Sequence, residues 1–124
     1  MSAYTSQLPE AVAAWNASGA ACNFSINPAS PNRVYINDDI SGYGKIYAGG
    51  HPYYSFSIEI NSVNIGNDAE WTNLASGVMV HELGHALGLD DMPSQQYAIM
   101  GYAHDWNTVY KPTISDIAGV NSNW

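Results

Sequence analysis

The chain has 124 residues, the usual length of one domain, so we expect a single folded unit over residues 1–124. Its 11 acidic side chains outnumber 3 basic ones and give a net charge of -8, which argues against a surface that neutralises phosphates and so against nucleic acid as a partner. No apolar run reaches the roughly 20 residues that span a bilayer, and no basic cluster would hold the chain at an anionic membrane.

The cysteine content excludes an internal disulfide and a thiolate zinc cluster. Cys22 is the only cysteine, so the chain can form neither an internal disulfide nor a zinc cluster built from several thiolates. The redox compartment is left open. The first residues lack the basic and apolar regions of a signal peptide, which fits a cytoplasmic protein or a chain trimmed to its mature domain.

The first part of the sequence predicts one helix followed by short strands. Residues 8–16 have apolar side chains at helical spacing, a proline in the first turn and a glycine, Gly19, beyond the end. Residues 24–26 and 33–37 are strand candidates separated by turn-forming residues.

The middle of the sequence continues with strands. Glycines and a proline surround residues 45–48 and leave them as a brief strand. Residues 56–60 alternate apolar and polar side chains, the pattern of a strand with one buried face. We expect a turn at residues 64–68.

The last part predicts two helices. Residues 71–87 have apolar side chains three and four positions apart, which indicates a long helix that ends at Gly88. A loop region over residues 89–110 follows. A terminal helix is expected from Thr113, because Thr113 and Asp116 have the spacing of a capping box with aspartate in place of glutamate.

His81, Glu82 and His85 carry the strongest chemical signal. On a helix, His81 and His85 lie one turn apart on one face, where two imidazoles can bind one zinc ion. Glu82 is rotated off that face and is better placed to touch a water on the metal than the metal itself. Zinc lowers the pKa of such a water to about 7, and Glu82 can take its proton as the water attacks a carbonyl carbon. The pattern predicts zinc-dependent hydrolysis of peptide bonds.

A catalytic zinc normally has a third protein ligand and one open position. Gly88 can adopt the left-handed conformation that ends a helix and turns the chain back. Asp91, three residues later, can then reach the metal. Asp90 and His104 are the alternative third ligands.

The run from His81 to Gly88 resembles the motif His-Glu-x-x-His-x-x-Gly-x-x-His of the metzincin clan of zinc metallopeptidases. Asp91 stands where the clan usually has its last histidine, as in the small snapalysin group of bacterial neutral proteases, which this short chain also resembles. The resemblance implies a zinc metalloendopeptidase with one catalytic ion on His81, His85 and Asp91, and with Glu82 as general base.

Two further segments carry the resemblance. Residues 98–102 look like the clan's Met-turn, which implies that Met100 lies beneath the zinc and that Tyr102 binds the metal or stabilises the tetrahedral intermediate. Residues 71–74 and 112–120 resemble the matrixin branch, in which Asp116 would buttress the Met-turn.

The resemblance also implies a fold: a small α+β domain with a mixed twisted sheet, an active-site helix, a Met-turn and a C-terminal helix. The zinc would separate an upper part of about residues 1–88 from a lower part of about residues 89–124. A protein or peptide substrate would pair with a sheet edge, either residues 45–49 or residues 55–61, and the family mapping favours the first. The clan's first strand has little room before the first helix.

Other expectations concern ions, location and activity. Asp38 and Asp39 suggest calcium, since hard cations favour oxygen ligands, but no spaced loop supplies six donors. We expect a secreted monomer, with the cytoplasm left open. Two other hypotheses stay open: a zinc-binding module without activity, against which the presence of Glu82 argues, and a peptide-binding domain without metal.

Overall fold

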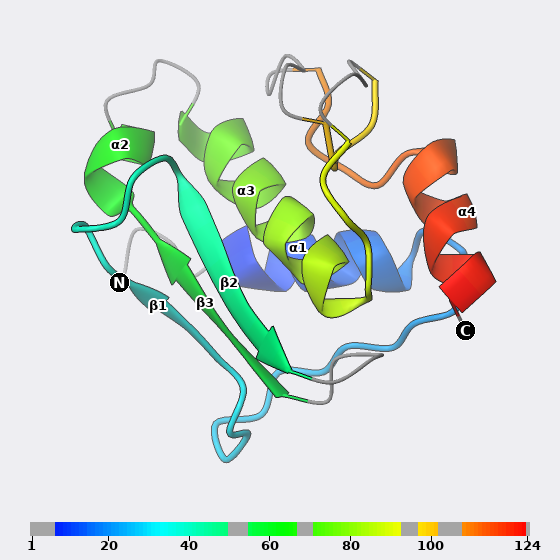
Figure 1. Cartoon of the computed structure of the whole chain (residues 1–124), viewed down its shortest axis with the longest axis horizontal. Helices are drawn as coiled ribbons and strands as arrows, with labels where there is room; N and C mark the ends of the chain where they lie inside the picture. Colours follow the sequence, from blue (N-terminus) through cyan, green and yellow to red (C-terminus); the bar gives the residue numbers. More distant parts are fainter. Residues whose placement is uncertain (1–6, 50–54, 67–70, 93–96, 102–107, 124) are drawn as a thin grey trace.

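The computed structural model of the protein describes residues 7–49, 55–66, 71–92, 97–101 and 108–123 (Figure 1). In chain order the elements are α1 (Gln7–Asn16), β1 (Arg33–Ile36), β2 (Gly44–Gly49), β3 (Ser55–Ile60), α2 (Ser62–Gly66), α3 (Trp71–Ala86) and α4 (Ile114–Asn123). Over these ranges, four helices and a three-stranded mixed sheet confirm the predicted combination of helices with a mixed sheet.

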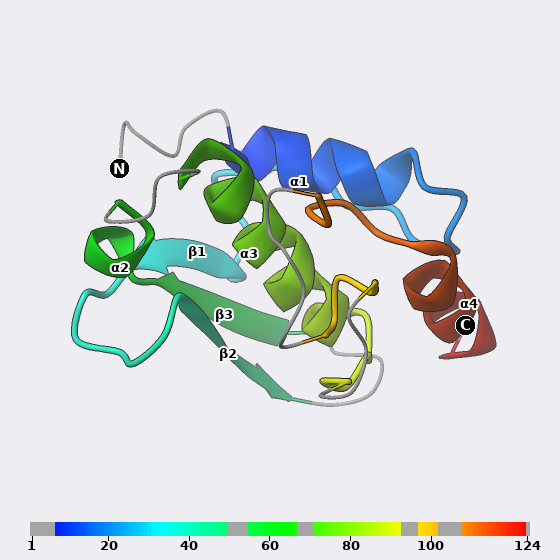
Figure 2. The same ribbon diagram turned by 90° about the horizontal axis from the view of Figure 1, so that it is seen from above.

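β3 is the central strand of the sheet, with β1 parallel to it on one side and β2 antiparallel on the other. Ile58 pairs with Val34 of β1 and with Ile46 of β2, so apolar side chains of all three strands share one face. α3 lies across the sheet and α1 packs beside α3 (Figure 2). Because β3 is internal, the expectation that residues 55–61 could offer a free sheet edge is wrong.

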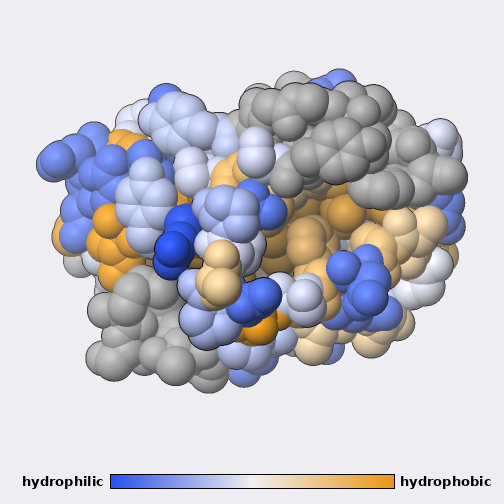
Figure 3. All heavy atoms as spheres, turned by 90° about the horizontal axis from the view of Figure 1, so that it is seen from below, coloured by the Kyte–Doolittle hydropathy of each residue, from blue (hydrophilic) through white to orange (hydrophobic). Residues whose placement is uncertain are grey.

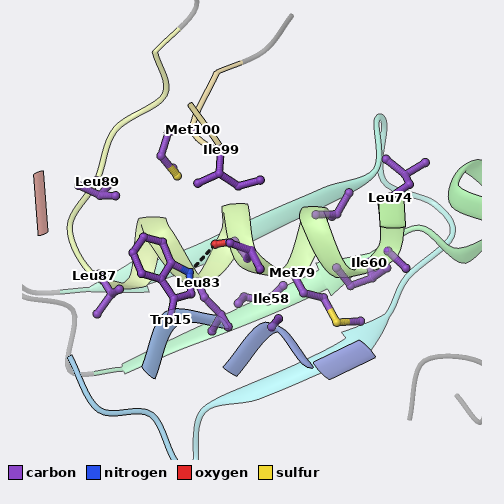
Figure 4. Close-up of a cluster of buried hydrophobic side chains, with 14 of the residues drawn as sticks. Trp15, Ile58, Ile60, Leu74, Met79, Leu83, Leu87, Leu89, Ile99 and Met100 are labelled. Carbon is purple, nitrogen blue, oxygen red and sulfur yellow. Dashed lines mark hydrogen bonds between the residues drawn. The ribbon is translucent and has the colours of Figure 1, made fainter. Parts of the chain in front are cut away.

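α3 is the buried centre of the described fold. Its residues 74–80 are all buried, so the helix has no solvent-facing stripe over these two turns. Figure 4 shows Trp15 of α1 against α3, where its Nε1–H donates a 2.8 Å hydrogen bond to the carbonyl oxygen of Val80. This bond satisfies the polar atom of a fully buried side chain and joins α1 to α3 just before His81. None of the helices in the described ranges has the length and apolar character that a membrane crossing needs.

Residues 24–26 are not a strand, contrary to the prediction. The backbone N–H and C=O of Phe24 are bonded, each at 2.8 Å, to the side-chain amide of Asn16. This segment and β1 line a hollow of about 380 Å³, whose apolar walls include Phe24, Val34 and Val12. Seen from below in Figure 3, apolar side chains gather around a hollow in the surface. Phe24 therefore forms these backbone hydrogen bonds with a side chain and not with a neighbouring strand, and an apolar hollow lies beside the segment.

Residues 64–66 belong to α2, so the turn predicted there is wrong, while residues 67 and 68 lie outside the described ranges. Asn61 caps α2, since its Oδ1 accepts a 2.9 Å hydrogen bond from the backbone N–H of Asn64. A helix of five residues is too short to show a helical period in the sequence. The other helices and strands each overlap their predicted ranges.

Gly84 gives a test of the packing around α3. A Cβ at this position would lie 2.5 Å from Met100 Sδ and 3.3 Å from Trp15 Cζ2, and both of those side chains are fully buried. We expect Gly84→Ala to lower the free energy of unfolding by about 1 to 3 kcal/mol, although alanine favours helix. Denaturant unfolding measures the change, with Gly66→Ala as control because its Cβ would meet nothing within 4 Å. Equal stability of the two variants would contradict the close packing at Gly84.

Candidate metal centre

α3 ends at Ala86, and Gly88, the glycine predicted to terminate the helix, lies in the turn that leads the chain back toward the helix. Gly88 has a φ of 92°, in the left-handed region that glycine adopts without steric cost. The N–H of Leu89 donates to the carbonyl of Gly84 (3.0 Å) and the N–H of Gly88 to that of His85 (2.9 Å), the two bonds of a Schellman motif. The reversal brings Asp91 next to His85.

His81, His85 and Asp91 bring three possible metal-ligand atoms together. Asp91 Oδ1 lies 3.1 Å from Nε2 of His81 and 3.1 Å from Nε2 of His85, and all three atoms are within 4.8 Å of one another. The histidine side chains are 12% and 18% exposed and that of Asp91 is 34% exposed, so the group is open to solvent on one side. Asp90 is exposed and outside this group, and His104 lies outside the described residues.

The other ring nitrogen of each histidine faces a backbone carbonyl. His81 Nδ1 lies 2.7 Å from the carbonyl oxygen of Ile99, and His85 Nδ1 lies 2.8 Å from that of Leu89. A carbonyl oxygen only accepts hydrogen bonds, so these partners assign the hydrogen to Nδ1 and leave an electron pair on Nε2 of a neutral ring. Burial lowers the pKa of His81, which favours the neutral ring.

Residues 98–101, the described part of the predicted Met-turn, form a turn packed against α3. The N–H of Gly101 donates to the carbonyl of Ala98 (3.0 Å), and the N–H of Met92 donates to that of Met100 (2.9 Å). The side chain of Met100 is fully buried and points toward α3 in Figure 4, against Gly84. The turn therefore packs against α3 through Met100 and is hydrogen-bonded to Met92, in the segment that follows α3.

Asp116, at the start of α4, bonds to the same turn. Its Oδ2 accepts hydrogen bonds from the N–H of Ile99 (2.9 Å) and from the N–H and hydroxyl of Thr113 (2.8 and 2.7 Å), and its Oδ1 lies 3.4 Å from the N–H of Met100. The bond to the Thr113 N–H is the predicted capping-box contact. The carbonyl oxygen of Ile99 accepts a hydrogen bond from the His81 ring. By holding Ile99 in place, the fully buried Asp116 therefore supports the orientation of that imidazole.

Glu82 lies in the wall of a cavity of about 560 Å³ together with His81, His85 and Asp91. Its side chain is almost fully buried, and this burial, with a smaller effect of the Asp91 charge, raises the pKa of Glu82 to about 8. A carboxyl group with such a pKa can both accept and return a proton near neutral pH. The cavity is also lined by Gly42, Tyr43, Gly44, Lys45, Ile46, Val78 and Gly101.

The other residues predicted to bind an ion or to act in catalysis are not part of this group in the described structure. Tyr102 lies outside the described residues. The Oδ1 of Asp38 accepts hydrogen bonds from the N–H and hydroxyl of Ser62 (2.7 and 2.8 Å), so this carboxylate is used at the start of α2. In the described ranges, His81, His85 and Asp91 are the one group of three His, Cys, Asp or Glu side chains that could hold a metal. The carbonyls that orient the histidines were not predicted, because every residue type has one.

In the metal-free protein, the raised pKa of Glu82 makes stability depend on pH. The ordinary pKa is 4.5, so between about pH 4.5 and 8 the unfolded chain loses a proton that the folded state keeps, and stability falls as pH rises. Glu82→Gln removes this cost. We expect the variant to exceed the wild type in stability by up to about 4 kcal/mol at pH 8 and to match it near pH 4.

Denaturant unfolding in the presence of a chelator, at both pH values, measures this difference. Glu10→Gln, the same change at an exposed glutamate of α1 whose hydrogen bond from Ser76 a glutamine can still accept, is the control for the substitution itself. A Glu82→Gln effect that is the same at both pH values would contradict the raised pKa.

Comparison with known proteins identifies no family for this chain: no family model matches it, and no curated protein matches it.

Proposed function

We propose that this chain is a zinc-dependent endopeptidase in which His81, His85 and Asp91 hold the metal and Glu82 is the general base. The observation that carries the proposal is the meeting of two imidazole Nε2 atoms and one carboxylate oxygen beside a buried glutamic acid in one cavity. Imidazole nitrogen and carboxylate oxygen are ligands that zinc accepts, and three protein ligands leave a position open for chemistry.

The hydrogen bonds of the histidines support a cation at this point. With each Nδ1–H directed at a carbonyl, the two Nε2 atoms and Asp91 Oδ1 are all electron-pair donors. Donors 3.1 Å apart repel one another unless a proton or a metal ion lies between them. We favour the metal ion, because one ion can satisfy all three atoms at once.

The residues of the cavity can divide the steps of peptide hydrolysis. Bound zinc would supply a Lewis acid for the carbonyl and lower the pKa of a water molecule. Glu82 takes a proton from the water as the water oxygen adds to the carbonyl carbon. It then gives that proton to the amide nitrogen as the C–N bond breaks, which leaves a carboxylic acid and an amine.

β2 supports a protein or peptide as substrate. The cavity runs along the first residues of β2, and in the described sheet this strand has a neighbour, β3, on one side only. Its other side can offer backbone N–H and C=O groups to an extended peptide. Substrate would then lie along residues 45–49, with the bond to be cleaved near Glu82.

The resemblance to metzincins and to the snapalysin group extends the proposal. On this basis the chain acts outside the cell as a monomer, and the part from about residue 89 forms the lower side of the cleft. Tyr102 would stabilise the tetrahedral intermediate with its hydroxyl.

Hydrolysis of a denatured protein tests the proposed function. We expect the wild type to cleave it, a chelator to abolish cleavage, and Glu82→Ala to lower the rate at least about 100-fold, because general acid–base catalysis contributes that much. Glu10→Ala is the matched control and should keep full activity. A zinc-binding module without activity would bind the ion and cleave nothing, whereas a metal-free peptide-binding domain would do neither.

The third ligand can be tested with two adjacent aspartates. We expect Asp91→Ala to weaken zinc affinity more than about tenfold and Asp90→Ala to leave it unchanged, because Asp91 alone of the two lies with the histidines. Competition with a zinc-binding dye measures both affinities. The reverse pattern would assign the ligand to Asp90.

A further inference from the structure

The connection between β1 and β2, residues 37–43, forms one rim of the cleft, and we call it the rim loop. Gly42 and Tyr43 of this loop line the cavity that contains His81 and Glu82. Whatever holds the rim loop in place therefore affects the space in which a substrate would meet Glu82.

Asn61, directly after β3, is the residue around which the rim loop folds, and it is only 3% exposed. Its Nδ2 donates hydrogen bonds to the carbonyl oxygens of Asp38 (3.2 Å) and Ile40 (2.8 Å), and its backbone N–H donates to that of Tyr43 (2.8 Å). Its Oδ1 accepts from Asn64. Both polar atoms of this buried side chain are thus used.

The two hydrogens of the Asn61 amide lie between two carbonyl oxygens of the rim loop. Two carbonyl oxygens of the rim loop meet at this side chain, and they need a donor or a positive ion between them. A carboxylate in the same place has no hydrogen to give. Asn61→Asp therefore keeps the size of the side chain but removes both hydrogen bonds to the rim loop.

The rim loop leads directly to the general base. Tyr43 is followed by Gly44, where β2 begins, and a Cβ on Gly44 would lie 3.2 Å from Glu82 Oε1 and 2.8 Å from Val78 Cγ1. At such close contact, a shift of about 1 Å in the loop would change the position of the Glu82 carboxyl group, and misplacements of this size lower rates strongly.

We propose that Asn61 is a positioning residue that seats the rim loop so that Gly44 lies against Glu82. The proposal rests on the proposed hydrolysis, in which Glu82 transfers the proton. Asn61 is not part of the cavity lining, so it acts through Tyr43 and Gly44 and not by contact with substrate.

Peptide hydrolysis by Asn61→Ala tests the proposal. At a temperature where the variant is fully folded, we expect kcat to fall about tenfold, KM to change less, and the zinc content per chain to stay that of the wild type. Asn16→Ala is the matched control, because Asn16 also holds a loop through its side-chain amide, at Phe24, away from the cavity. It should keep kcat within about twofold of wild type.

A second variant and a second measurement keep the test decisive. If Asn61→Ala does not fold, Asn61→Asp, which keeps the Oδ1 acceptor but cannot donate to the carbonyls of Asp38 and Ile40, should lower kcat in the same way. Hydrogen exchange of the backbone amides of residues 37–43 should be at least about tenfold faster in Asn61→Ala or Asn61→Asp than in wild type, and unchanged in Asn16→Ala.

An unchanged kcat in Asn61→Ala, or an equal fall in Asn16→Ala, would overturn the positioning role. Hydrogen exchange of the rim loop that is no faster in Asn61→Ala than in wild type would overturn the role of the amide in holding the rim loop. This second measurement needs no enzymatic activity, so it still decides about the rim loop if the wild type cleaves no peptide and the proposed function fails.

Discussion

The turn at Gly88, directly after α3, is the constraint on which the rest of the site depends. Its positive φ turns the chain back within three residues, so that His85, inside the helix, and Asp91, after it, lie side by side. Leu89 links the turn to its surroundings: its carbonyl accepts from His85, and its side chain would meet a Cβ placed on Gly119 of α4 at 2.7 Å. The same turn therefore ends the helix and places the proposed metal ligands His85 and Asp91 side by side.

His81 depends on residues much further along the chain. Asp116 accepts a hydrogen bond from the N–H of Ile99, and the carbonyl of Ile99 faces Nδ1 of His81, so a single residue connects α4 to the imidazole. Met100 packs on Gly84 from the same turn, between the two histidines of the helix. The turn can pack this closely against α3 only because Gly84 has no side chain. The absence of a Cβ at Gly84 is therefore as necessary for this packing as the presence of Met100.

The sequence predicted what local spacing decides and failed where partners lie far apart. The helix that carries His81 and His85, the turn at Gly88 after it and the cap by Asp116 follow from patterns within a few residues, and all agree with the structure. The strand predicted at residues 24–26 has the right side chains, but a strand also needs a neighbour, which a local pattern cannot supply. The contact of Gly44 with Glu82 joins residues from a strand edge and a helix, so no motif in the sequence indicates it.

Each side of the cleft is held in place by a buried polar side chain at the start of a helix. Asn61 caps α2 and also bonds to the rim loop, while Asp116 caps α4 and also bonds to the turn at residues 98–101. A chain with one cysteine cannot hold such loops by an internal disulfide. Buried amide and carboxylate groups can replace that covalent link, because removing one of them would leave several backbone groups unpaired at once and each such group costs about 1 to 3 kcal/mol. The loops can therefore approach α3 closely without a covalent link, while their positions are still determined.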